Sequence, residues 1–247
     1  DKLSDYLRKN TRSYNNFCIN KRTNRVIRAI IPTHTFGHPF EIDKIISLSK
    51  KYNLRVIEDA AESLGSFYKN KHTGTFGDIG ILSFNGNKTI TTGGGGIILT
   101  NNKKYADKAR HLTTTAKKKH KFELIYDMVG YNYRLPNINA AIGCAQLEQL
   151  GYFLKSKRKL FKEYKKAFQN ISEVKLFNEP KNCKSNYWLQ TIIIKRGNFT
   201  LRNLILKTAN KKGIALRPVW RILPKLPHFK FCPHMDISNS KELEQKI

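Results

Sequence analysis

Short apolar runs alternate with amphipathic stretches through the first half of the chain. Four runs are rich in Ile, Val and Leu, which favours short buried strands: residues 28–32, 54–60, 77–85 and 95–101. Residues 41–53 and 104–112 instead repeat apolar side chains at a helical period. Strands that alternate with helices in this way predict a mostly parallel sheet covered by helices on both faces.

The second half of the chain starts with a long helical pattern over residues 137–171, in which lysines occupy the side opposite to Ala, Ile, Leu and Phe. Further patterns predict a linker, a strand, a helix that ends at Gly213 and another strand, at residues 178–186, 188–196, 201–213 and 214–220. We therefore expect a large domain over residues 1–136. The connecting helix and a smaller α/β domain are expected over residues 137–247.

The bulk composition is that of a globular protein with one or two domains in 247 residues. The sequence contains no apolar run of the ~18 residues that a membrane span needs, and its start lacks the core of a signal peptide. It begins without Met and stops inside a charged helical pattern, so we expect a fragment truncated at both ends. We expect no membrane association.

The four cysteines are widely spaced, which argues against a zinc ribbon and provides no disulfide framework. This pattern is typical of a reducing cytoplasm. His34 and His38 are four positions apart, but Gly37 and Pro39 disfavour a regular helix there. We therefore expect no metal site.

The net charge of +28 is open to two interpretations. A strongly basic chain can bind nucleic acid. Here, however, lysine is spread along the whole chain together with Asn and Ile, as simple compositional bias would also produce. The densest basic run, residues 117–121, lacks the interleaved aromatic residues of a base-stacking surface. We expect no nucleic-acid partner, and note that a basic surface also favours anionic small molecules such as nucleotide sugars.

The stretch SFNGNKTITTGGGG, residues 83–96, is the strongest candidate for chemistry. It does not match a Walker A loop, because the Gly-to-Lys spacing is wrong and a strand follows where a helix is required. A lysine can instead form a Schiff base with pyridoxal phosphate. Asp59 at a strand end could then face the pyridinium nitrogen, Ser83 could donate to the phosphate, and the glycines would give the backbone clearance.

Three stretches carry a family resemblance: VIEDAAESLGS, GTFGDIGILSFNGNKTITTGGGG and GYNYRLPNINAAIGCAQLEQL. Together they resemble the sugar aminotransferases of the DegT/DnrJ/EryC1/StrS family. The resemblance implies a pyridoxal-phosphate enzyme with the aspartate aminotransferase fold (fold type I, α/β). The phrases SFNGNK, TTGGGG and HLTTTAK are most similar to members that aminate carbon 4 of UDP-linked 4-keto-6-deoxy-N-acetylhexosamines, with glutamate as the expected amino donor, for surface glycan synthesis.

The resemblance also implies roles for individual residues. Lys88 matches the lysine that forms the Schiff base and shuttles the proton, and Asp59 matches the partner of the pyridine nitrogen. Glu62 matches a position beside the cofactor ring and its phenolic oxygen, and Ser83 matches a phosphate ligand. Asn132 matches a phosphate ligand donated by the neighbouring subunit, which implies a homodimer with shared active sites.

Arg217 and Trp220 fall in the segment that lines the sugar-nucleotide pocket of the family, and His34 is a further candidate near the substrate. Each candidate also has a structural interpretation. Asp59 could cap a helix, Glu62 could be solvated, and Ser83 could simply end a strand. Asn132 could be a turn residue, Arg217 could form a surface ion pair, and His34 could hold a loop.

The chain also departs from the family pattern. Relatives carry, before the region matched here, a phosphate-binding loop at a helix N-terminus and a residue that stacks on the cofactor ring. Residues 1–10 resemble the helix after the third strand of the large domain, so we expect an incomplete sheet with exposed apolar edges and poor cofactor binding by this chain alone. An inactive fragment and a nucleic-acid-binding protein remain alternatives. A family dehydratase is a further one, which Lys88 disfavours because dehydratases of the family typically carry His at that position.

Overall fold

A computed structural model describes residues 2–247, and the chain forms two compact units. The first, which we call the sheet unit, comprises Arg28–Leu160 and Glu179–Leu189. The second, the terminal unit, comprises the residues up to Ile27 together with Phe161–Asn178 and Gln190–Ile247. The division between domains at residue 136 remains a prediction.

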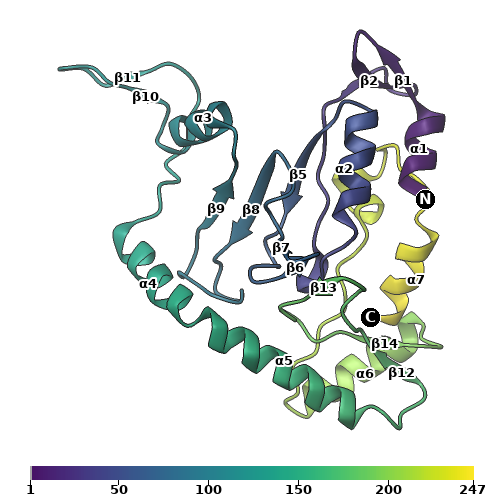
Figure 1. Ribbon diagram of the computed structural model, residues 1–247. Helices are drawn as coiled ribbons and strands as arrows, with labels where there is room; N and C mark the ends of the chain where they lie inside the picture. Colours follow the sequence, from purple (N-terminus) through teal and green to yellow (C-terminus); the bar gives the residue numbers. More distant parts are fainter. Residues whose placement is uncertain (1) are drawn as a thin grey trace. The chain divides into compact units, whose positions relative to one another are not determined.

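A four-stranded sheet with the order β4-β5-β8-β9 forms the centre of the sheet unit (Figure 1). Its strands are β4 (Ala29–Ile30), β5 (Arg55–Asp59), β8 (Ile79–Ser83) and β9 (Gly96–Leu99). The β4–β5 and β5–β8 pairs are parallel, whereas β8 and β9 are antiparallel. The predicted mostly parallel sheet is confirmed.

Two apolar clusters fix helices to this sheet. The helix α2 (Ile42–Lys51) buries Ile42 against Val56 of β5 and Tyr68. The second cluster joins Leu82 of β8 to residues that follow β5 and β8, and the first turn of α5 packs against it. Both helices follow the apolar periodicity of the sequence, so burial of one face explains their position.

The connecting helical region consists of two helices, α4 (Asn137–Glu148) and α5 (Leu150–Ala167), and not of the single pattern predicted for residues 137–171. At Gln149 the backbone N–H bonds to the oxygen of Gln146, three residues back, which ends α4. Gly151 follows immediately, and glycine is a poor helix former. The break therefore has a local cause.

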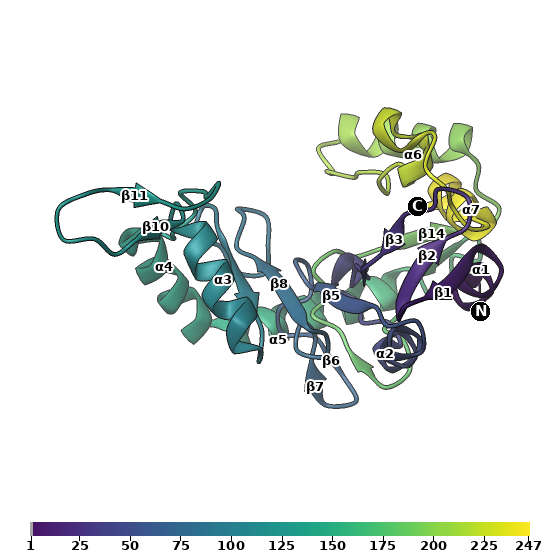
Figure 2. The same cartoon turned by 90° about the horizontal axis from the view of Figure 1, so that it is seen from above.

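The helix α3 (Lys103–Thr113) starts at Asn102, whose side chain accepts the N–H groups of Lys104 and Tyr105. A hairpin of β10 (Lys117–Lys118) and β11 (Ile125–Tyr126) follows it and extends away from α3 (Figure 2). The sheet unit also contains a small antiparallel sheet of β6 (Phe67–Tyr68), β7 (Lys71–His72) and β13 (Cys183–Lys184).

Among the described residues, the terminal unit contains two antiparallel sheets, three whole helices and the part of α5 from Phe161 onward. One sheet is formed by β1 (Thr11–Tyr14), β2 (Phe17–Asn20) and β3 (Val26–Ile27), and the other by β12 (Val174–Leu176) and β14 (Ile192–Ile194). The helices are α1 (Lys2–Asn10), α6 (Phe199–Lys211) and α7 (Ser238–Lys246). Short 3₁₀ turns occur at Thr35–Gly37 in the sheet unit and at Leu223–Lys225 and Pro227–Phe229 here.

Three sequence-based predictions of local structure need correction. The predicted linker at residues 178–186 contains β13, which pairs with β6. Within residues 2–247 the predicted strand at 214–220 does not form: the oxygen of Leu216 accepts from Asn210 of α6, and the N–H of Val219 bonds to Ile247, so these groups serve no strand ladder. The run at 28–32 is only half-buried, because β4 is an edge strand.

Apolar side chains are exposed at both edges of the four-stranded sheet. Ile31, which follows β4, is 63% exposed, and Ile97 and Ile98 of β9 are also exposed. This agrees with the expectation of exposed apolar edges. No helix among the described residues is both long and apolar enough to cross a membrane.

Candidate active site

Two candidate residues end neighbouring parallel strands. Asp59 is the last residue of β5 and Ser83 is the last residue of β8, and the parallel pairing of Ile57–Asp59 with Ile79–Ile81 places Asp59 opposite Ile81, two residues before Ser83. Polar groups at the carboxyl ends of adjacent parallel strands form the usual ligand-binding edge of such a sheet. The polar positions of the sequence are thus collected at one edge by the strand register.

Backbone hydrogen bonds and one apolar anchor fix the loop that carries Lys88. The N–H of Phe84 bonds to Gly95 O at 2.9 Å and the N–H of Thr92 bonds to Phe84 O at 3.0 Å, which closes the base of the loop. Ile90 is buried in the apolar cluster that contains Phe84. Lys88 therefore lies between two fixed points of the backbone.

The glycine run has turn and ladder functions within the chain itself. Gly93 and Gly95 have φ values of +79° and +102°, a region that side chains other than glycine rarely adopt. A Cβ atom on Gly96 would lie 2.4 Å from Leu82 O, across the β8–β9 ladder. The backbone itself therefore requires glycine at three of these four positions, Gly93, Gly95 and Gly96. That the run also leaves space for a flat cofactor remains a prediction.

Lys88 and Glu62 face each other. The Nζ atom of Lys88 lies 3.7 Å from Glu62 Oε1, and the two side chains are only 14% and 10% exposed. The other carboxylate oxygen of Glu62 accepts the N–H of Phe36 at 2.8 Å. Burial raises the pKa of Glu62 above its ordinary value, although the Phe36 N–H and Lys88 oppose this, while the charge of Asp59 adds to it.

Two hydrogen bonds hold the Asp59 carboxylate at the strand end. Its Oδ1 atom accepts the N–H of Ala61 at 3.2 Å, and its Oδ2 atom accepts the hydroxyl of Thr33 at 3.3 Å. A turn follows, not a helix, so Asp59 caps a turn. Ser83 Oγ accepts the N–H of Asn85 at 3.3 Å, which leaves the hydroxyl hydrogen able to point to a further acceptor.

His34 lies in the interior of the sheet unit, and the structure shows it in structural contacts. Its side chain is fully buried, its ring stacks on Phe40 at 4.4 Å between centroids, and its Nε2 atom lies 3.1 Å from Glu58 Oε2. A substrate contact through His34 remains a prediction.

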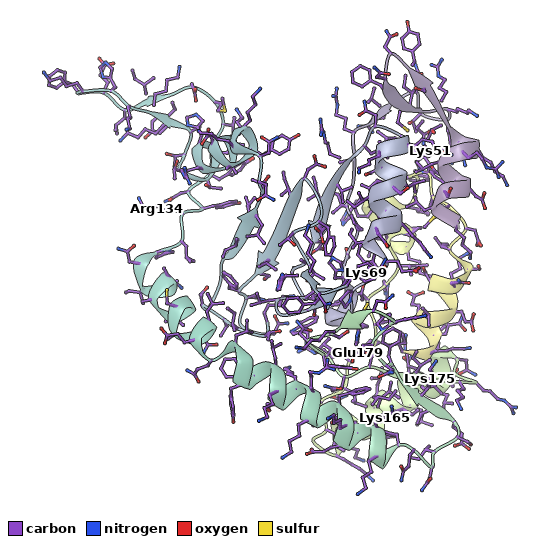
Figure 3. The ribbon with its side chains drawn as sticks, in the orientation of Figure 1. Lys51, Lys69, Arg134, Lys165, Lys175 and Glu179 are labelled. Carbon is purple, nitrogen blue, oxygen red and sulfur yellow. The ribbon has the colours of Figure 1, made fainter. Side chains whose placement is uncertain are left out.

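Three further candidates lie on other segments of the chain than Asp59, Glu62, Ser83 and Lys88. Asn132 is exposed on the segment between β11 and α4, where it bridges to Thr114, and Arg134 of the same segment is labelled in Figure 3. Arg217 and Trp220 belong to the terminal unit and both are exposed. Their roles remain predictions.

Sequence reasoning missed two residues that contact the Lys88 loop. Trp188 lies with its ring centroid 4.1 Å from Lys88 Nζ, and Asn186 donates to Thr89 Oγ1. Both are almost fully buried. The signal was the aromatic pair in SNYW, directly after a stretch interpreted as a linker, because buried aromatic residues are unusual in exposed linkers.

The segment that carries these residues is tied to α5. Arg158 of α5 contacts both carboxylate oxygens of Glu179, at 2.9 and 2.8 Å, and Glu179 is labelled in Figure 3. The same carboxylate accepts the N–H of Ser185 at 2.8 Å. Burial alone would raise the pKa of Glu179, but Arg158 and the Ser185 N–H hold it below its ordinary value. Glu179 is thus a charged anchor for residues 185–188.

Comparison with known proteins identifies relatives over most of the chain. Residues 16–245 match the DegT/DnrJ/EryC1/StrS aminotransferase family. GDP-perosamine synthase of Escherichia coli O157:H7 is 41% identical over 211 residues, which cover 85% of this chain and 56% of the relative. The putative pyridoxal phosphate-dependent aminotransferase EpsN of Bacillus subtilis is 39% identical over 219 residues, covering 87% of this chain and 56% of EpsN.

Among solved structures, Helicobacter pylori PseC, an aminotransferase involved in the biosynthesis of pseudoaminic acid, superimposes with a TM-score of 0.84 at 26% identity. The match covers 92% of this chain and 61% of PseC. This agreement confirms the predicted fold class, the α/β fold of type I aminotransferases. The chain spans just over half the length of the curated relatives named above.

Proposed function

Because this chain belongs to the DegT/DnrJ/EryC1/StrS aminotransferase family, we propose that it acts in a pyridoxal-phosphate-dependent aminotransferase that aminates a nucleotide-linked sugar. The observation that carries the proposal is the amine of Lys88, 3.7 Å from Glu62 and on the loop that follows Ser83. A largely shielded amine beside a carboxylate, at the ligand-binding edge of a parallel sheet, has the surroundings of a reactive lysine.

The residues present suit pyridoxal phosphate. The amine of Lys88 would hold the aldehyde carbon, the carboxylate of Asp59 would pair with the ring nitrogen, and the hydroxyl of Ser83 would donate to the phosphate. When bound, this cofactor supplies an electron sink for the carbon that is aminated. The hydroxyl hydrogen of Ser83 and the strand-end position of Asp59 support this assignment.

Lys88 and Glu62 would have separate roles in proton transfer. Lys88 would move the proton at the sugar carbon, since it is the amine of the site. Glu62 would lie by the phenolic oxygen of the ring, and its raised pKa makes its carboxyl able to share a proton there. The backbone N–H of Phe36 fixes the orientation of the Glu62 carboxylate, which supports a role in which that carboxylate must point toward the cofactor ring.

We propose carbon 4 of a 4-keto-6-deoxy sugar as the site of amination. The amino group of glutamate replaces the ketone oxygen, so the products are the 4-amino sugar and 2-oxoglutarate. The motifs SFNGNK and HLTTTAK favour a UDP-linked sugar, whereas the name of the Escherichia coli relative refers to a GDP sugar. Parallel assays with UDP- and GDP-linked 4-keto sugars, followed by mass spectrometry of the product, decide between them. Failure of both substrates with the cofactor attached would contradict the proposal.

We further propose a homodimer in which Asn132 reaches the phosphate of the neighbouring subunit. The segment around Asn132 supports this, because a partner subunit would bury a group of large apolar side chains that are exposed in the single chain: Phe122, Leu124, Tyr126, Val129, Tyr131 and Tyr133. Sedimentation velocity should show a dimer that the paired change Tyr131→Ser with Tyr133→Ser weakens. A monomer at every concentration would contradict the dimer.

We propose Arg217, Trp220 and His34 as residues that contact the substrate. Arg217 and Trp220 offer a cation and an aromatic face, which suit a diphosphate and a base or sugar ring. Arg217→Ala should raise KM for the sugar nucleotide and leave kcat almost unchanged. An unchanged KM would remove Arg217 from the pocket.

A further inference from the structure

Trp188 contacts the Lys88 loop at two points. The centre of its ring lies 4.1 Å from Lys88 Nζ, and its indole N–H donates to Asn87 O at 2.6 Å. One buried side chain thus meets both the amine of Lys88 and the peptide group that precedes it. An ammonium over an indole face is attracted by the ring quadrupole, and the ring face offers no lone pair to take its proton. The ring therefore restrains the position of the Lys88 amine.

Asn186 holds the other side of the same loop. Its side-chain amide lies within hydrogen-bond distance of Glu62 O, at 2.8 Å, and of Thr89 Oγ1, at 3.2 Å. Its Oδ1 atom accepts the N–H of Trp188 at 2.8 Å. Asn186 therefore links three groups: the backbone oxygen of Glu62, the side chain of Thr89 and the backbone N–H of Trp188.

The residue between these two has an unusual backbone. Tyr187 has a φ of +50°, in the left-handed region that bulky side chains avoid. Its surroundings hold it there: the ring is buried, its hydroxyl accepts the N–H of Glu179, and Arg158 lies 5.4 Å from the ring centre. Such local strain persists at sites where the direction of neighbouring side chains matters.

We propose that Asn186 and Trp188 form a clamp that positions the Lys88 amine opposite Glu62. This inference rests on the proposed function of Lys88, and it assigns positioning roles to two residues outside the cofactor-binding set. The clamp sets the direction of Lys88 from a segment that α5 anchors through Arg158 and Glu179.

The test compares Trp188→Leu with Trp188→Phe in the cofactor-free chain. The readout is the rate at which an acetylating reagent modifies Lys88, measured by peptide mass spectrometry relative to exposed Lys103 in the same sample. Loss of the ring should raise the Lys88 rate about fivefold, which corresponds to ~1 kcal/mol of lost restraint. Trp188→Phe should keep the rate close to that of the unsubstituted chain, and Tyr152→Leu, at an exposed aromatic residue of α5, is the matched control.

A folded Trp188→Leu chain with an unchanged Lys88 rate would overturn the clamp, and so would a Phe chain that reacts as fast as the Leu chain. Trp188→Phe keeps an aromatic face but loses the indole N–H that donates to Asn87 O, so amide hydrogen exchange at residues 87–89 should quicken in it. If Trp188→Leu does not fold, this exchange decides, and unchanged exchange overturns the clamp. Failure here leaves the role of Lys88 intact, whereas cofactor attachment that survives Lys88→Ala contradicts the proposed function and leaves these rates unaffected.

Discussion

The Nε2 atom of His34 lies 3.1 Å from Glu58 Oε2, and both side chains are fully buried. The Glu58 carboxylate also accepts the N–H groups of Gly74, Phe76 and Gly77, so four donors converge on it. Burial alone would raise the pKa of Glu58, but these donors hold it below its ordinary value. Glu58 thus fixes the turn between β7 and β8 directly beneath the strand end that carries Asp59.

Glu58→Gln should lower the free energy of unfolding by ~3 kcal/mol, because an amide has a single acceptor oxygen for donors that a buried carboxylate now satisfies. Urea unfolding measures this change. Glu41→Gln is the matched control: Glu41 is exposed and pairs with Lys44 on the surface, so its loss should cost under ~1 kcal/mol. Equal effects of the two substitutions would contradict the role given to Glu58.

Two glycines of the same strand and loop should respond differently to alanine. A Cβ atom on Gly80 would lie 1.8 Å from Gly74 O, whereas one on Gly86 would meet no atom within 4 Å. Gly80→Ala should therefore destabilise the chain by ~3 kcal/mol or more, since backbone must move to admit the methyl group. Gly86→Ala should be close to neutral. Thermal unfolding followed by circular dichroism checks this order, and a stable Gly80→Ala chain would refute the packing described.

The stability of the chain should depend on pH through His38. Burial lowers the pKa of His38 from its ordinary 6.5 to about 4, although the charge of Glu179 opposes the shift. Between these values the unfolded chain binds a proton that the folded chain excludes, so stability falls as the pH decreases, by up to ~1.4 kcal/mol per pH unit. His38→Asn, which cannot titrate there, should lose this slope in urea unfolding from pH 7 to 4. Parallel slopes would show that His38 does not titrate as described.

The sheet was predictable because each of its strands carries its own signal. Val56 and Leu82 lie in apolar runs whose length and composition suit buried strands. The polar residues Asp59 and Ser83 mark where these two strands end. The segment at 214–220 has a similar composition, but strand formation also needs a partner. There the backbone groups of Leu216 and Val219 bond to α6 and to Ile247 instead.

The candidate site was predictable only in part, for a related reason. Lys88 and Glu62 belong to motifs that a reader of the sequence can recognise, and the structure brings them to 3.7 Å. Asn186 and Trp188 approach the loop from a segment far away in the sequence, through the anchor between Arg158 and Glu179. No local periodicity encodes such a long-range contact, so tertiary structure was needed to find it.

We expect pyridoxal phosphate to attach to the amine of Lys88. The direct measurement is reduction with borohydride in the presence of pyridoxal phosphate, followed by peptide mass spectrometry, on the unsubstituted chain and on Lys88→Ala. Pyridoxal phosphate is supplied in large excess, since we expect this chain alone to bind the cofactor weakly. We expect the cofactor mass on the Lys88 peptide and loss of the visible absorbance in Lys88→Ala. Absorbance and labelling that are unchanged in Lys88→Ala would contradict it.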